Sequence, residues 1–167
     1  MAEPGSAIDQ LIDRHLNAND AGVADLPVQP RLRVAVVTCM DARLDLFALF
    51  RLGPGEAHVI RNAGGVVTDD VIRSLAVSQR RLGTREVLVL HHTGCGMTTF
   101  TDDEFRGELE RDTGLRPPWA VEAFVDVKEN VRQSVQRVRR SPYLIHTTVV
   151  RGFVVDVQTH QVDEVHT

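Results

Sequence analysis

Two short runs of branched apolar residues constrain the fold of this chain more than any other feature. Residues 34–38 read VAVVT and residues 86–91 read EVLVLH, without an interrupting glycine or proline. Continuous β-branched runs of this length are typical of parallel strands that helices cover on both faces. A weaker run, AHVIR at residues 57–61, is a third candidate strand. The sequence therefore predicts an α/β fold with a mostly parallel central β-sheet flanked by helices.

Helical patterns alternate with these strands. Thr68 can cap a helix that Gly83 can end. A later helix is predicted from Asp126, with Glu129 three positions on as in a capping box, to a point before Pro142. Strands that alternate with helices favour a parallel sheet built from crossover units.

The two ends of the chain have patterns of their own. Apolar residues recur at helical spacing in residues 6–18, which predicts an amphipathic helical arm, and residues 19–31 read as a linker. Residues 148–167 read as a strand, a turn and a short strand, which would add a C-terminal edge strand to the sheet. We expect a single domain over residues 1–167, with residues 1–31 as its N-terminal arm and linker.

Bulk properties exclude several classes of protein. The net charge of −4 gives no general basic surface for nucleic acid, and no apolar run is long enough to span a membrane. The first ten residues lack the basic flank and apolar stretch of a signal peptide. We therefore expect a cytoplasmic protein with no nucleic-acid or membrane partner. By count alone, Cys39 and Cys95 could be two buried small residues or a disulfide.

The residues that follow the strands favour a more specific interpretation. Cys39 comes directly after the first run, and His92 and Cys95 follow the third in HHTGCGM. Parallel strands end at one edge of a sheet, so these side chains converge if the first and third strands are neighbours. Two thiolates and an imidazole form a ligand set for Zn²⁺. Three such ligands leave the fourth position for water, for substrate or for Asp41.

Asp41 and Arg43 follow Cys39 at alternating positions. An ion pair with Arg43 would hold the Asp41 carboxylate away from the metal, where it could accept a proton from zinc-bound water. If the pair breaks, Asp41 could become the fourth ligand and close the site. The alternative is that Asp41 caps a helix from Leu44 while Arg43 is solvated. The glycines of NAGGVV, residues 62–67, either allow close approach to a small ligand or form an ordinary tight turn.

Three motifs together resemble the signature of the β-class carbonic anhydrases. They are C-x-D-x-R at residues 39–43, RNAG at residues 61–64 and H-x-x-C-G-M at residues 92–97. Their order and separation are most similar to the short microbial, archaeal-type branch, and the resemblance covers about residues 5–166. Either half of the pattern would be weak evidence alone, whereas the two together are highly specific.

The resemblance implies a cofactor, a reaction and an assembly. It implies Zn²⁺ bound by Cys39, His92 and Cys95, with Asp41 and Arg43 as the catalytic pair. The implied reaction is the reversible hydration of CO₂ to bicarbonate and a proton by zinc-bound hydroxide. The implied assembly is a homodimer in which the N-terminal arm wraps the partner, with a tetramer as an alternative.

The substrate pocket is assigned from chemistry alone. CO₂ is small and apolar, so it needs a dry pocket beside the metal rather than a polar clamp. Ala63, Val66 and Val67 could supply part of the pocket wall, with Gly64 in the same loop. Gly96 could offer a backbone N–H to the developing bicarbonate.

The histidines outside the motif have weaker assignments. His91 or His58 could relay protons to buffer, although a lone histidine is more often a satisfied or surface group. His91 also competes with His92 as the metal ligand, and the H-x-x-C spacing favours His92. Residues 98–126 carry few signals, and no site is assigned there.

Three other functions use the same residues. The first is a hydrolase on the same scaffold that acts on another small carbon substrate, such as carbon disulfide. The second is a non-catalytic zinc protein in which Asp41 completes a closed site. The third is a thiol enzyme, although the segment from Cys39 to Arg43 is too short for a phosphatase loop. A separation above about 5 Å between the sulfurs of Cys39 and Cys95 would exclude tetrahedral zinc binding.

Overall fold

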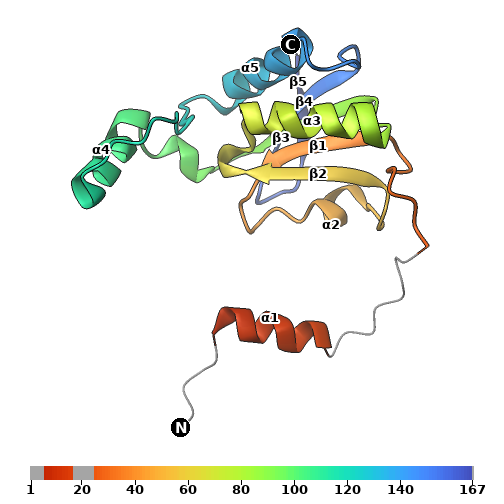
Figure 1. The fold of residues 1–167 in the computed structure, drawn as a ribbon, viewed down its shortest axis with the longest axis horizontal. Coiled ribbons are helices and arrows are strands. Elements are labelled where there is room, and N and C mark those ends of the chain that lie inside the picture. The colour runs from red at the N-terminus through yellow and green to blue at the C-terminus, as the bar shows by residue number, and fades with distance from the viewer. Residues whose placement is uncertain (1–5, 17–24, 167) are drawn as a thin grey trace.

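The computed structural model describes residues 6–16 and 25–166 (Figure 1). Its elements, in chain order, are α1 (Ala7–Leu16), β1 (Val34–Cys39), α2 (Leu46–Phe50), β2 (Ala57–Asn62), η1 (Ala63–Gly65), α3 (Asp69–Leu82), β3 (Glu86–His92), η2 (Gly96–Thr98), α4 (Asp102–Thr113), α5 (Val127–Arg140), β4 (Val150–Val155) and β5 (Val162–Val165).

A five-stranded sheet forms the centre of the fold, in the order β2-β1-β3-β4-β5. The first four strands are parallel, and β5 pairs antiparallel to β4. The predicted fold class is therefore confirmed, including the C-terminal edge strand. The strands that carry Cys39 and His92 are neighbours, which was the condition for their side chains to converge.

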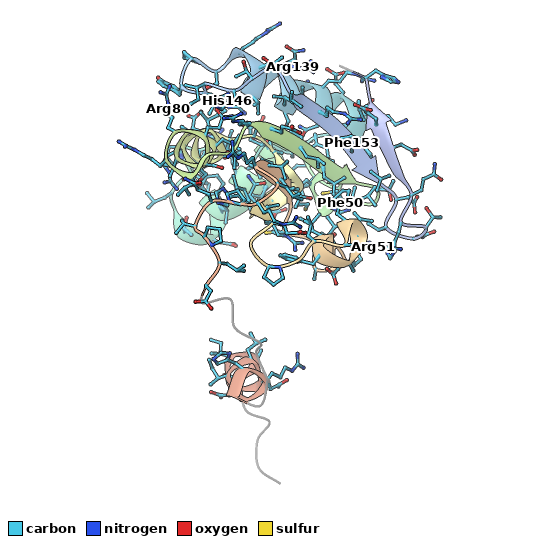
Figure 2. All side chains as sticks on the ribbon, turned by 90° about the vertical axis from the view of Figure 1, so that its right-hand side faces the viewer. Phe50, Arg51, Arg80, Arg139, His146 and Phe153 are labelled. Carbon is cyan, nitrogen blue, oxygen red and sulfur yellow. The ribbon has the colours of Figure 1, made fainter. Side chains whose placement is uncertain are left out.

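Helices cover the two faces of the sheet unequally. Helices α3 and α5 lie on one face and the short α2 on the other (Figure 1). The α5 face is packed by three fully buried valines, Val131, Val135 and Val138. On the opposite side, Phe50 of α2 and Phe153 of β4 pack against a second apolar cluster (Figure 2). This second cluster extends to both cysteines, so the metal centre is built into the edge of the core.

Capping residues account for the ends of the predicted helices. The Thr68 side chain accepts a hydrogen bond from the Val71 N–H, and Gly83 ends α3 in the left-handed conformation. Asp126 accepts from the Glu129 N–H at 3.0 Å. The expected capping box on α5 is only half formed, because the Glu129 carboxylate binds Arg132 and Gln133 farther along the helix.

Helix α4 was not predicted, because it lacks a buried apolar stripe. It has no buried residue. Its first turn is held instead by a complete capping box, in which Thr101 and Glu104 each bind the other's backbone N–H. A helix stabilised in this way leaves no periodic apolar signal.

The N-terminal helix is present and lies apart from the sheet (Figure 1). It covers most of the predicted 6–18; residues 17–18 of that prediction and residues 19–24 of the predicted linker lie outside the described residues. The apolar side chains of Ile8, Leu11 and Ile12 on α1 are exposed. Within the described ranges, no helix is long and apolar enough to cross a membrane.

Candidate metal centre

The ends of two neighbouring strands place three buried side chains together. Cys39 is the last residue of β1, His92 is the last residue of β3, and Cys95 lies just before η2. The two thiols are free, and their Sγ atoms are 3.9 Å apart. The sulfurs and one ring nitrogen of His92 all lie within 4.8 Å of one another.

This arrangement fits a tetrahedral zinc site. Zn–S bonds of about 2.3 Å at tetrahedral angles place two sulfurs roughly 3.8 Å apart, which agrees with the observed 3.9 Å. The Nδ1 atom of His92 hydrogen-bonds the Thr93 carbonyl at 2.9 Å. Because a carbonyl only accepts, Nδ1 carries the proton and Nε2 has a free lone pair. Nε2 is buried and has no hydrogen-bond partner among the described residues, as expected of a metal ligand.

Asp41 and Arg43 form a two-point ion pair beside these ligands. Arg43 donates from Nε to Asp41 Oδ1 at 2.9 Å and from Nη2 to Asp41 Oδ2 at 2.6 Å. Arg43 Nη2 also binds the Gly94 carbonyl at 2.9 Å, which joins the loop after β1 to the loop after β3. Asp41 Oδ2 lies 3.7 Å from His92 Nε2. The carboxylate is therefore held next to the metal-binding atoms by the guanidinium.

The helix-capping alternative for Asp41 is wrong. Helix α2 begins at Leu46 and is capped by Asp45, whose side chain accepts from the Ala48 N–H. The Asp41 side chain instead accepts the backbone N–H of Arg43, in addition to its guanidinium.

The electrostatics of the site favour the charged forms of Asp41 and Cys39 but the neutral form of Cys95. Hydrogen bonds from the Arg43 side chain and backbone hold the pKa of Asp41 well below its ordinary value. Burial raises the pKa of Cys39, but the adjacent His92 ring and the backbone N–H groups of Asp41 and Gly64 outweigh it and lower the pKa to about 7. Burial raises the pKa of Cys95 to about 11 against a hydrogen bond from the Met97 N–H. A bound cation would favour the thiolate form of both residues.

The two glycines of the loop after β2 are explained by packing. Gly64 and Gly65 both have positive φ, 81° and 71°. A Cβ on Gly65 would lie 2.8 Å from the Cys39 backbone nitrogen, and one on Gly64 would lie 2.9 Å from the Phe124 ring. The predicted close approach is thus made by protein atoms, and the tight-turn interpretation accounts for both glycines.

The other predicted pocket residues surround the same loops. Ala63, Val66 and both cysteines belong to one apolar cluster, whereas Val67 packs into the core on the opposite face. Space next to Gly96 is open, since a Cβ built there meets no atom within 4 Å.

Neither candidate relay histidine faces the ligands. His91 is buried, its Nε2 binds Asn130 Oδ1 at 2.9 Å, and burial lowers its pKa to about 4. His58 pairs in register with Ala35, near the start of β1, and its Nδ1 binds Ser78 Oγ at 2.8 Å. Because Cys39 is four residues farther along β1, His58 belongs to the opposite end of the sheet.

Residues 98–126, to which no site was assigned, contribute to the centre. Phe124 is 9% exposed and belongs to the same cluster as the two cysteines. Its ring meets the ring of His91 edge-on, with centroids 5.7 Å apart. The apolar residues around Phe124 in AVEAFVDV were its only sequence signal, and they resemble an ordinary core segment.

Comparisons with known proteins agree on one family. A family model described as carbonic anhydrase matches residues 34–120. The chain is 56% identical over 140 residues to β-carbonic anhydrase 1 of Mycobacterium tuberculosis strain H37Rv, covering 84% of this chain and 86% of that protein. It is 33% identical over 154 residues to a carbon disulfide hydrolase of Acidianus sp. strain A1-3, covering 77% of this chain and 75% of that protein.

The comparison with solved structures identifies the same family. The carbonic anhydrase of Streptococcus mutans matches with a TM-score of 0.91 and 42% sequence identity, covering 98% of this chain and 100% of that one.

Proposed function

This chain belongs to the β-carbonic anhydrase family of zinc-dependent lyases, and we propose how its own residues carry out the reversible hydration of CO₂. Cys39, His92 and Cys95 are the metal ligands in this proposal. The observation that carries it is the cluster of three ligand atoms within 4.8 Å of one another, next to a carboxylate that an arginine holds in place.

A zinc ion held by Cys39, His92 and Cys95 would supply the nucleophile. Bound Zn²⁺ lowers the pKa of a coordinated water to about 7, so that its deprotonated form is available at neutral pH.

Asp41 and Arg43 act on that water as a pair. Asp41 is ionised and acceptor-only, and its Oδ2 lies 3.7 Å from the ligand nitrogen of His92. It could therefore accept a proton or a hydrogen bond from a water molecule held beside these ligands and orient that water toward CO₂. The two donors of Arg43 keep the carboxylate from turning toward the cation. Loss of that pair would let Asp41 become the fourth ligand and close the site.

The substrate is held by shape rather than by charge. We assign the apolar wall to Ala63, Gly64 and Val66, which lie in or beside the cluster that contains both cysteines. Gly96 borders open space and offers its backbone N–H to bicarbonate, whose negative charge CO₂ lacks.

The assembly we propose is a homodimer, with a tetramer as the alternative. Ile8, Leu11 and Ile12 of α1 expose an apolar stripe that a globular chain normally buries. Docking of this arm on a second copy would bury it, and residues 1–31 would then serve the interface while one domain carries the site. Light scattering after gel filtration measures the mass directly, and a monomer at micromolar concentration would contradict the dimer. The two free thiols suit the reducing cytoplasm, where we place the protein.

Stopped-flow CO₂ hydration tests the activity. Zinc-loaded protein should hydrate CO₂ with about one Zn per chain, and a Cys39→Ser variant should have neither the metal nor the activity. Carbon disulfide is the second substrate to assay, because a carbon disulfide hydrolase is a more distant relative. Turnover of carbon disulfide without CO₂ hydration would reject the proposal, as would full zinc occupancy with no turnover of either substrate.

A further inference from the structure

An irregular segment between α4 and α5, residues 115–126, is held by Arg106, by Arg137 and, just before Phe124, by one carboxylate. We call this segment the strap. Asp102, the first residue of α4, accepts backbone N–H groups from Val121 at 2.9 Å, Glu122 at 3.3 Å and Ala123 at 2.8 Å. Glu122 has a φ of 64°, in the left-handed region. Such a turn lets successive N–H groups converge on one anion.

The strap carries Phe124 onto the loops of the metal centre. The Phe124 N–H donates to the Met97 carbonyl at 3.2 Å. Its ring occupies the space where a side chain on Gly64 would lie, and it meets the His91 ring edge-on. Phe124 follows directly after Ala123, the last of the three residues that bind Asp102, so Asp102 holds the backbone from which the ring projects.

The residues that Phe124 touches lie beside the metal ligands. Gly64 precedes Gly65, where a Cβ would lie 2.8 Å from the backbone nitrogen of Cys39. Met97 lies two positions after Cys95, in the short turn of helix that Cys95 caps. Phe124 therefore packs against both loops that position a metal-binding sulfur, and a shift of either loop would move that sulfur.

We propose that Asp102 is a positioning residue for the metal centre: it holds the strap so that Phe124 keeps the loops beside Cys39 and Cys95 in place. With those loops in place, the two sulfurs keep the 3.9 Å separation that suits a single tetrahedral cation. Partners that lie behind metal ligands commonly change metal affinity by about 10- to 100-fold. This inference rests on the proposed function only in assuming that the three ligands bind a divalent cation.

Metal affinity and cobalt absorption test the role of Asp102. The variants are Asp102→Asn, which keeps the size of the side chain but removes its charge, and Phe124→Leu, which removes the ring. Asp112→Asn is the matched control, since Asp112 is exposed near the other end of α4. Zinc affinity is measured by chelator competition, and the thiolate-to-cobalt charge-transfer band is recorded after Co²⁺ substitution.

Both strap variants should bind zinc about tenfold more weakly at neutral pH. Their charge-transfer bands should change in position or intensity, because the orbital overlap between thiolate and cobalt depends on where the sulfurs lie. Asp112→Asn should change neither property. Wild-type affinity and an unchanged cobalt spectrum in both strap variants would overturn the proposal, even if their melting temperatures fall, because a purely structural tie predicts only that fall. If Asp102→Asn does not fold, the zinc affinity and cobalt spectrum of Phe124→Leu test the proposal by themselves.

The outcome is separable from that of the proposed function. Both readouts concern metal binding and need no turnover. Zinc-loaded wild-type protein without CO₂ hydration would reject the proposed function and leave the strap measurements interpretable. If the wild type hydrates CO₂ normally and neither strap variant changes metal affinity or the cobalt spectrum, only the proposed role of Asp102 is rejected.

Discussion

The two ends of the sheet differ in whether their buried polar atoms have hydrogen-bond partners. At the carboxyl end, Asn62 Oδ1, His91 Nδ1 and His92 Nε2 are buried without a hydrogen-bond partner among the residues that the structure describes. At the amino end, Ser78 Oγ binds both His58 Nδ1 at 2.8 Å and Thr84 Oγ1 at 2.7 Å. An unpaired buried polar atom costs about 1–3 kcal/mol, so the carboxyl end is held ready for a ligand at the expense of stability.

Gln79 shows how complete the pairing at the amino end is. Its amide donates to the His146 carbonyl and accepts the N–H groups of Ile145 and His146. Figure 2 labels His146 near Arg80, the neighbour of Gln79 at the end of α3. Polar side chains at this end join elements to one another, whereas His92 at the carboxyl end presents an unpaired nitrogen to the metal centre. Changes at the two ends should therefore separate activity from stability.

The largest effect is expected from Cys95→Ser. A serine hydroxyl does not ionise near neutral pH, so it is a poor replacement for a thiolate ligand. We expect zinc to be lost and CO₂ hydration to fall by more than about a hundredfold, since even residues behind the ligands can cost that much. Metal analysis of the purified variant, together with stopped-flow rates, checks this. A zinc-replete, active Cys95→Ser protein would remove Cys95 from the ligand set.

Asp41→Asn should be the next largest change. The amide cannot accept a proton at the fourth position, and general acid–base groups contribute roughly 10²–10⁴-fold to rates. We expect a loss of about a hundredfold in kcat/KM with zinc content unchanged. Arg43→Lys is the companion variant, because a lysine can pair with Asp41 but not through two parallel hydrogen bonds. Equal rates for Asp41→Asn and wild type would show that the pair has no part in the reaction.

Ser78→Ala tests the opposite end of the sheet. The change leaves the fully buried Thr84 hydroxyl and the His58 ring without their shared partner. We expect the free energy of unfolding to fall by about 1–3 kcal/mol, with CO₂ hydration unchanged. Urea unfolding and stopped-flow assays of the same preparation measure the two quantities. A large loss of activity in a folded, zinc-loaded Ser78→Ala protein would break the division between the ends.

The smallest effect concerns pH. Because the pKa of Asp41 is lower in the folded protein than its ordinary value of 3.8, the ion pair stabilises the fold fully above that value. The contribution is lost as the pH falls below 3.8 toward the folded pKa. The difference in melting temperature between metal-free wild type and Asp41→Asn should therefore be constant from neutral to mildly acidic pH and shrink in stronger acid. A difference that changes near pH 7 would mean that another group titrates with the pair.

Local patterns in the sequence were sufficient for much of the fold. Branched apolar runs identified β1 and β3, and caps such as Thr68 and Gly83 marked the ends of α3. The convergence of Cys39 with His92 followed from the rule that parallel strands end at one edge. These features depend on residues that are close in the chain or on general topology.

Other features depend on contacts between distant residues and left no local signal. Asp102 reads as one of three acidic residues in the first turn of a helix, yet its carboxylate organises a segment about twenty positions away. The sites of His58 and His91 depend on strand register and on which face of the sheet each side chain occupies. Composition and spacing contain neither kind of information.

The ligands lie at the ends of the neighbouring strands β1 and β3 and in the loop after β3, with 56 positions between the two cysteines. A cation held there acts as a cross-link that closes a long loop of the chain. Free metal at a hundred times its dissociation constant would add about 2.7 kcal/mol to the free energy of unfolding. Zinc starvation would therefore shorten the lifetime of this protein in the cell, because chains that have lost their metal unfold more often and are exposed to proteases.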